Sequence, residues 1–135
     1  MSKPQRVIYF KAHLDDRPGE LLKVTKELNS KNISLSGLWG FATSPGKAEL
    51  YVIAKKADKL RKAWKDAGIL AEEKTAFYLA GTDRPGALLK SLEALARAGI
   101  NIQAIDAISV GGRYGSYVWV NDADVQRAAG VLGAK

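Results

Sequence analysis

The stretch DRPGELLK at residues 16–23 returns as DRPGALLK at residues 83–90. Residues 16–28 and 83–95 share eight of thirteen positions, and the same spacing relates Phe10 to Phe77. The period is too long, and the copies too few, for a solenoid. The chain is therefore a duplication of one unit, and we place its two domains at residues 1–73 and 74–135.

Each copy shows the order strand, helix, strand, strand, helix. In the first copy, residues 6–14 alternate between two faces, which predicts a strand. Asp16 is expected to cap the next helix and Pro18 to stand in its first turn, with an apolar stripe of Leu21, Leu22, Thr25 and Leu28. Two extended runs, residues 33–43 and 47–55, are joined by turn residues and predict a hairpin, which a helix over residues 57–67 follows.

The second copy repeats this order with extended runs at residues 101–110 and 114–121 and a helix at 122–132. A last strand fits residues 69–73 of the first copy, but residues 133–135 leave almost nothing for its counterpart. We therefore predict an α+β fold: two tandem ferredoxin-like (split βαβ, βαββαβ) units with antiparallel sheets, the second unit lacking most of its last strand.

One strand of each hairpin is apolar on both sides, at residues 50–54 and 117–120. A sheet with one solvated face would alternate instead. Burial of apolar surface is worth roughly 25 cal/mol per Å². We therefore expect a second subunit to cover the open sheet face, which predicts a homodimer.

The net charge of +7 and the absence of cysteine limit the function classes. The positive excess gathers around the helix predicted at 57–67, where apolar residues interrupt it, as is typical of a solvated helix face. Nucleic-acid binding is therefore disfavoured. Without cysteine, disulfides and thiolate metal sites are excluded. No apolar run is long enough for a membrane helix and no secretory signal is evident, so a cytoplasmic location is expected.

The residue types also disfavour an enzyme. The chain has a single His, no Cys and no paired carboxylates that both copies share, so a nucleophile or acid–base pair is not expected, nor is a cofactor or metal. An RNA-binding module of the same topology stays open as the alternative. Tyr9, Tyr51, Tyr78 and Trp119 fall on predicted strands, although outside the aromatic-glycine pattern of such modules.

The repeated Asp-Arg-Pro-Gly segments, residues 16–19 and 83–86, are here called the first and second corner. Pro fixes its own φ and Gly permits close backbone approach, so each corner is rigid and open. The first-turn N–H groups of the following helix carry partial positive charge and form a seat for a carboxylate. Arg17 and Arg84 could bind the same anion, and residues 14–22 and 81–89 are the expected pocket walls.

An apolar strand, the Asp-Arg-Pro-Gly-x-Leu-Leu corner and a helix that ends in Gly-Ile-Asn-Ile at residues 99–102 resemble the ACT domain, a family of amino-acid-binding regulatory modules. The resemblance covers nearly the whole chain as two tandem domains. It implies a small-molecule ligand, an amino acid, bound at interfaces between paired domains, and a regulated enzyme acting in trans. Asn101, Asn32 and Ser34 would reach the ligand from the neighbouring domain. The implied ligand-binding residues are His13, Leu14, Asp15, Asp16, Arg17, Pro18, Gly19, Glu20, Leu21, Asn32 and Ser34 in the first copy, and Thr82, Asp83, Arg84, Pro85, Gly86, Ala87, Leu88 and Asn101 in the second.

Overall fold

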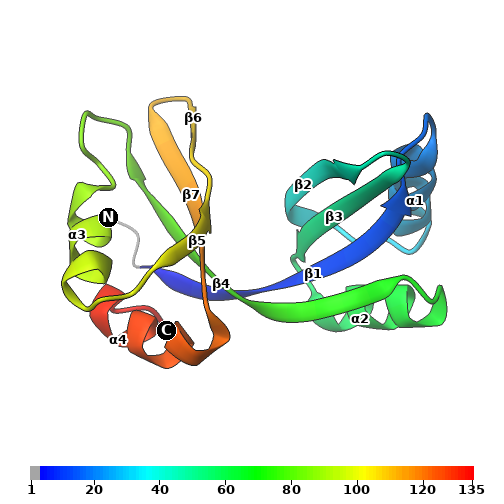
Figure 1. Cartoon of the computed structure of the whole chain (residues 1–135). Coiled ribbons are helices and arrows are strands. Elements are labelled where there is room, and N and C mark those ends of the chain that lie inside the picture. The colour runs from blue at the N-terminus through cyan, green and yellow to red at the C-terminus, as the bar shows by residue number, and fades with distance from the viewer. Residues whose placement is uncertain (1–3) are drawn as a thin grey trace. The chain divides into compact units, whose positions relative to one another are not determined.

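The computed structural model describes residues 4–135, which form two compact units (Figure 1). The first unit is residues 8–74, and the second combines residues 4–7 with 75–135. Two strands, β1 (Gln5–Asp15) and β4 (Leu70–Thr82), contribute residues to both units. The sequence predicts domains at residues 1–73 and 74–135. That each of these segments folds by itself stays a prediction. Within the described residues, no helix has the length and apolar character needed to cross a membrane.

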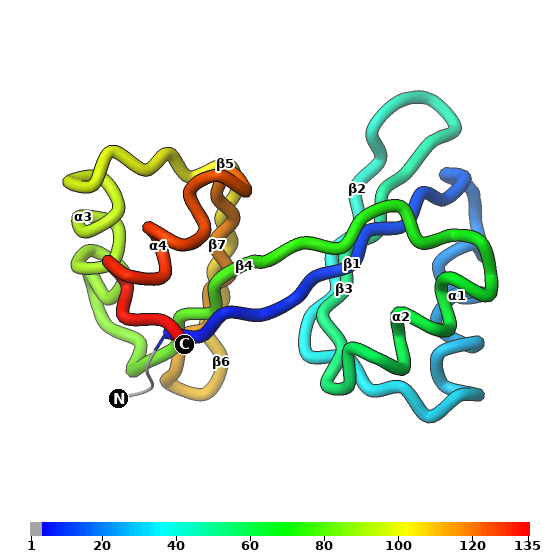
Figure 2. The backbone as a smooth tube through the Cα atoms, turned by 90° about the horizontal axis from the view of Figure 1, so that it is seen from below, coloured from blue at the N-terminus to red at the C-terminus, as the bar shows by residue number. Residues whose placement is uncertain are grey.

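The first unit has the split βαβ plan. After β1 come α1 (Glu20–Ser30), β2 (Leu35–Ser44), β3 (Lys47–Ala54), α2 (Ala57–Asp66) and the start of β4. Its strands lie in the order β2-β3-β1-β4, and β3 is antiparallel to both β2 and β1. Both helices lie on the same side of these strands (Figures 1 and 2). The split βαβ fold predicted from the element order is confirmed.

Alternation along the strands and helical spacing build the core of the first unit. Phe10 and Ala12 on β1 are fully buried, as the strand pattern predicts. From α1, however, the buried residues are Val24 and Leu28. Leu21 and Leu22 are 46% and 57% exposed, so the predicted helical stripe is wrong at its first turn. The core consists of Phe10, Ala12, Val24, Leu28, Ile33, Leu50, Val52, Leu60, Ala63 and Trp64.

The predicted cap at Asp16 is also wrong, because the helix begins later than expected. The residue before α1 is Gly19, in a left-handed conformation with φ of 90°, and no side chain caps the helix. This conformation suits glycine because it lacks a Cβ. The backbone N–H of Asp16 instead donates to Gly46 O in the hairpin turn, at 3.0 Å. The first corner is therefore a turn that precedes the helix.

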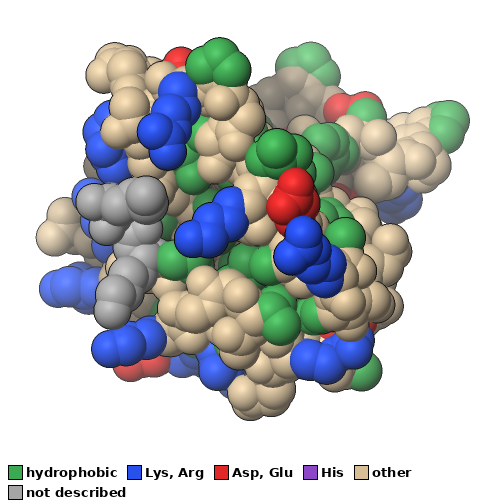
Figure 3. Space-filling model, turned by 90° about the vertical axis from the view of Figure 1, so that its left-hand side faces the viewer, with side chains coloured by type: hydrophobic (Ala, Val, Ile, Leu, Met, Phe, Trp, Pro, Cys, Tyr) green, Lys and Arg blue, Asp and Glu red, His purple; other side chains and the backbone are tan. Residues whose placement is uncertain are grey.

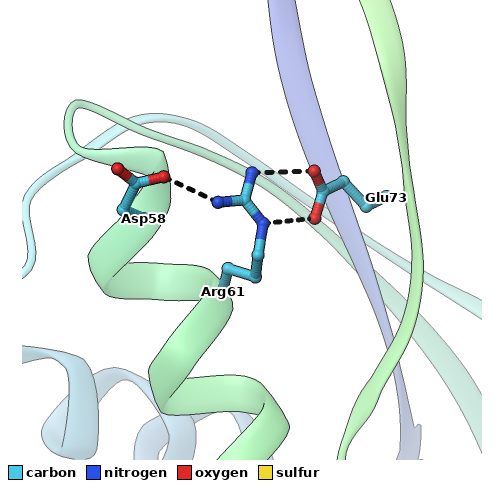
Figure 4. Close-up of polar contacts among 3 residues, drawn as sticks. All are labelled: Asp58, Arg61 and Glu73. Atoms are coloured by element: carbon cyan, nitrogen blue, oxygen red, sulfur yellow. Dashed lines mark hydrogen bonds and ion pairs between the residues drawn. The ribbon is translucent and has the colours of Figure 1, made fainter.

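The salt bridges of Arg61 tie α2 to β4 in the first unit (Figure 4). Its Nε atom donates to Glu73 Oε1 and its Nη2 atom to Glu73 Oε2, both at 2.7 Å, and Nη1 donates to Asp58 Oδ1 at 2.6 Å. The guanidinium also lies 5.6 Å from the centre of the Phe10 ring. The hydrogen bonds from Arg61 hold the pKa of the Glu73 carboxyl below its ordinary value.

The second unit repeats the plan with shorter elements. Its core consists of Phe77, Leu79, Leu95, Ile100, Val118, Val120, Ala128 and Ala129. The strand predicted at residues 101–110 is interrupted where the Oδ1 atom of Asp106 accepts a hydrogen bond from the Tyr117 N–H at 2.7 Å. After the rest of β4, the elements are α3 (Leu89–Arg97), β5 (Ile102–Ile105), β6 (Ile108–Val110), β7 (Arg113–Val120), a 3₁₀ turn (Asp122–Asp124) and α4 (Val125–Leu132).

The start of β1 supplies the strand that the second unit lacks in its own sequence. β4 has β1 on one side and β7 on the other, and residues of β1 up to Val7 belong to this unit. The Arg6 N–H donates to Lys135 O at 3.0 Å, and the Arg6 guanidinium donates to Gln126 Oε1 at 3.2 Å. The order β1-β4-β7-β5 is therefore a complete four-strand plan, with β6 also paired to β7.

The two copies differ by one residue within the hairpin. Phe10 lies opposite Val52, whereas Phe77 lies opposite Val118, so the spacing of 67 residues between the copies falls to 66 on β7. The extra residue of the first copy is Thr43, at an irregularity in the β2–β3 pairing between Ala42 and Ser44. Residues of β3 therefore correspond to residues 66 positions later, and Glu49 corresponds to Gly115.

Candidate functional site

A cavity borders each corner. The first cavity has a volume of 240 Å³ and the second a volume of 430 Å³. The first is lined by Leu14, Asp15, Asp16, Arg17, Glu20, Leu21, Gly40, Phe41, Ala42, Ala48, Glu49 and Leu50. The second is lined by Asp83, Arg84, Gly86, Ala87, Leu88, Leu89, Leu92, Ala107, Ile108, Ser109 and Tyr114.

The two cavities are equivalent parts of the duplicated fold. Residues 40–42 of the first cavity correspond to residues 107–109 of the second, at the same spacing that relates the corners. Ala48 corresponds to Tyr114 after the one-residue difference in the hairpin. The duplication therefore preserved the wall opposite each corner together with the corner itself.

In the first corner, Arg17 is paired with carboxylates of its own unit. Its Nε atom donates to Glu20 Oε1 at 2.7 Å, and its Nη2 atom lies 3.4 Å from Asp15 Oδ2. The hydrogen bond to Glu20 raises the pKa of the guanidinium further above its ordinary value. Lys47 approaches Asp15 as well, with 3.9 Å between Nζ and Oδ1.

Glu49 adds a second polar cluster to the first cavity. Lys11 Nζ lies 2.9 Å from Glu49 Oε2, and the Tyr51 hydroxyl donates to Oε1 at 2.9 Å. The hydrogen bond from Lys11 lowers the pKa of the Glu49 carboxyl, and the one from Tyr51 lowers it further. His13, whose side chain is 65% exposed, places Nδ1 3.8 Å from Glu49 Oε2. His13 thus stands beside the cavity and contacts one of its walls.

The second corner has a different charge arrangement. The positions of Asp15 and Glu20 are held by Thr82 and Ala87. Arg84 is exposed, and none of the residues 4–135 forms an ion pair with it. The Asp83 carboxylate accepts a hydrogen bond from the Ser109 hydroxyl at 2.6 Å. A guanidinium and a carboxylate therefore stand at the mouth of a cavity whose other walls are mainly apolar.

The structure brings part of the predicted site together. The predicted residues that line a cavity are Leu14, Asp15, Asp16, Arg17, Glu20 and Leu21, and Asp83, Arg84, Gly86, Ala87 and Leu88. Pro18, Gly19, Thr82 and Pro85 belong to the corners or border them without lining either cavity. Asn32, Ser34 and Asn101 follow the C-terminal ends of α1 and α3, one helix length from the corner of their own unit. Their role at a neighbouring domain stays a prediction.

The sequence analysis did not predict the hairpin residues that line the cavities, although the sequence carries a signal for them. The sequence predicts a hairpin, and an antiparallel strand places the hairpin turn beside the end of the first strand. Applying the spacing of 67 to residues 40–42 then gives residues 107–109. Among residues 4–135, no group of three or more Asp, Glu or His side chains is arranged to hold a metal ion.

Among known proteins, this chain matches solved structures only. No family model and no curated protein sequence matches this chain. Protein BT0572 from Bacteroides thetaiotaomicron is 26% identical, with a TM-score of 0.82 over 98% of this chain and 90% of that one. The regulatory subunit of aspartate kinase from Thermus thermophilus, in its ligand-free form, is 18% identical, with a TM-score of 0.61 over 97% and 91%. The corresponding subunit from Thermus flavus is 16% identical, with a TM-score of 0.62 over 98% and 95%. The chain therefore has the fold of these regulatory subunits along nearly its whole length.

Proposed function

We propose that this protein is a regulatory module that binds a small carboxylate ligand, an amino acid, in a cavity beside an Asp-Arg-Pro-Gly corner. The observation that carries the proposal is the presence of an equivalent cavity beside each Asp-Arg-Pro-Gly segment. The resemblance to ACT domains and the fold shared with regulatory subunits of aspartate kinase support it.

The polar groups at the corners suit an amino acid. A guanidinium binds a carboxylate through two parallel hydrogen bonds, and a nearby carboxylate can accept the ligand's ammonium group. Arg84 and Asp83 supply this pair in the second cavity. The apolar remainder of the wall removes ligand surface from water, as in most small-molecule sites.

The proposal describes a binding protein that acts on a partner. Ligand binding would shift the equilibrium between states of the chain, and a regulated enzyme in trans would respond to that shift. The proposal includes a homodimer. The strands at residues 50–54 and 117–120 carry apolar side chains on both sheet faces, and a second subunit would bury the face that the helices leave open. The test of the homodimer is the molar mass in solution, measured by light scattering.

RNA binding is the second candidate, and aromatic side chains outside the helix-covered core favour it. The ring centres of Tyr78 and Tyr117 lie 4.9 Å apart, and those of Tyr117 and Trp119 lie 6.3 Å apart. Bases stack on exposed aromatic rings in such modules. Here Tyr117 is half-buried, and burial raises the pKa of its hydroxyl above the ordinary value, so this ring offers less surface on which a base could stack.

A thermal-shift screen with the twenty amino acids separates the two candidates. A ligand at about 100 times its Kd should stabilise the protein by about 2.7 kcal/mol. Acetate and methylamine at the same concentration serve as controls for the separate charged groups. Binding of labelled RNA that weakens steeply with salt, with no shift from any amino acid, would favour the second candidate.

A further inference from the structure

We propose that the two corners are unequal: the second cavity binds an amino acid with an apolar side chain, while the first cavity excludes the ligand carboxylate. The inference rests on the proposed function and adds which unit binds and which ligand class is selected. It follows from the charges and volumes of the two cavities.

Carboxylates dominate the first cavity. Asp15, Asp16, Glu20 and Glu49 line it, and Arg17 is the one cation in its lining. The Glu49 carboxylate is bound by Lys11, and Lys47 lies 3.9 Å from Asp15, so the excess of negative charge rests mainly on Asp15, Asp16 and Glu20. Arg17 already contacts Asp15 and Glu20. A ligand carboxylate would have to displace one of these groups and then remain close to the others. Exposed ion pairs are individually weak, so the exclusion depends on the number of carboxylates and not on one salt bridge.

The second cavity has lost three of these four carboxylates and keeps Asp83 at the position of Asp16. Thr82, Ala87 and Gly115 stand where the first copy has Asp15, Glu20 and Glu49. Arg84 can therefore offer its full hydrogen-bonding edge to a ligand carboxylate. One Asp83 oxygen accepts from Ser109, which leaves the other for the ligand's ammonium group.

Volume and wall chemistry indicate the ligand's side chain. Small-molecule sites commonly have volumes of about 300–1,000 Å³. The second cavity, at 430 Å³, falls within this range, and the first, at 240 Å³, falls below it. Leu89 and Ile108 line the second cavity and are 58% and 68% exposed, so a ligand could cover apolar surface there. On the side of the molecule that carries α3, hydrophobic side chains show between Lys and Arg side chains (Figure 3). An aliphatic or aromatic amino acid fits these walls, whereas a charged side chain would lose its hydration.

Titration calorimetry on the full-length protein tests the inference with leucine, phenylalanine, glutamate and lysine as ligands. We expect leucine or phenylalanine to bind and the charged pair to bind at least tenfold more weakly. Arg84→Gln should raise Kd by about 10- to 150-fold, since a hydrogen bond to a charged group is lost. The matched variant Arg17→Gln should leave Kd within about twofold.

A second variant tests the charge argument without removing the guanidinium. Thr82→Asp with Ala87→Glu gives Arg84 the same two carboxylates that surround Arg17, and it should weaken binding by about five- to tenfold. Circular dichroism and melting temperature check that each variant folds.

The outcomes separate this inference from the proposed function. Binding that depends on Arg17 and not on Arg84, or equally on both, keeps the proposed function and overturns the inequality of the corners. Tighter binding of glutamate or lysine than of leucine overturns the ligand class. If the wild-type protein binds no amino acid at all, both proposals fall.

Discussion

Replacing Arg6 with proline tests whether the start of β1 completes the second unit. Proline has no backbone N–H, so Arg6→Pro removes the donor to Lys135 O together with the side-chain donor to Gln126. A hydrogen bond contributes about 1 kcal/mol to stability, and less where its groups are exposed. We expect a loss of about 1–2 kcal/mol from the second unit.

Hydrogen exchange, followed by mass spectrometry, locates this loss. A change of 1–2 kcal/mol corresponds to about 5- to 30-fold faster exchange where opening of the unit governs exchange. The acceleration should appear in β7 and in the part of β4 after residue 75, and β3 of the first unit should keep its rate. Arg6→Ala is the matched control because it keeps the N–H group, and it should cost about 0.5 kcal/mol or less. Unchanged exchange in β7, or equal acceleration in both units, would refute the assignment of this strand to the second unit.

Three further predictions concern stability. Leu28→Ala and Leu95→Ala remove equivalent side chains that are 3% and 0% exposed, and each should lower the free energy of unfolding by about 2–5 kcal/mol in urea denaturation; a loss below 1 kcal/mol for either would contradict the assigned cores. Because Arg61 lowers the pKa of Glu73 in the folded state, the stabilisation is complete above the ordinary value of 4.5 and is lost as the pH falls through the folded-state value. Glu73→Gln should therefore lower stability at pH 7 and flatten its decline in acid, and an unchanged acid profile would count against the Arg61 contact. Gly86, with φ of 74°, lacks a close neighbour for a Cβ, so Gly86→Ala should cost about 1 kcal/mol through backbone strain alone, as read from the melting temperature; an unchanged melting temperature would show that the second corner is not held in this conformation.

The split βαβ plan could be predicted because it depends on local patterns. Alternation in residues 6–14 defines a strand, and the repeat identifies the two copies from residue identities alone. The errors occur where local signals compete. Gly19 takes the left-handed conformation, so α1 begins after the first corner and Asp16 does not cap it. Asp106 binds the Tyr117 backbone, so one predicted strand becomes β5 and β6.

The sequence identified one wall of each cavity and missed the other. The corner residues were identified because they repeat, but the hairpin residues that complete the cavities carry no motif of their own. The difference between Glu20 and Ala87 is visible in the sequence. Its consequence for Arg17 and Arg84 is not, because ion pairing depends on distances of about 3 Å between side chains.

Sequence alone determined the duplication, the order of elements and the two corners, because residue spacing along the chain controls strand alternation, helix periodicity and turns. Tertiary structure decided which segment completes the second sheet and which arginine is paired. The first depends on a hydrogen bond between groups distant in sequence, Arg6 and Lys135, whose proximity no local pattern encodes. The second depends on side-chain distances within the first corner, where Arg17 contacts Asp15 and Glu20, its near neighbours in sequence.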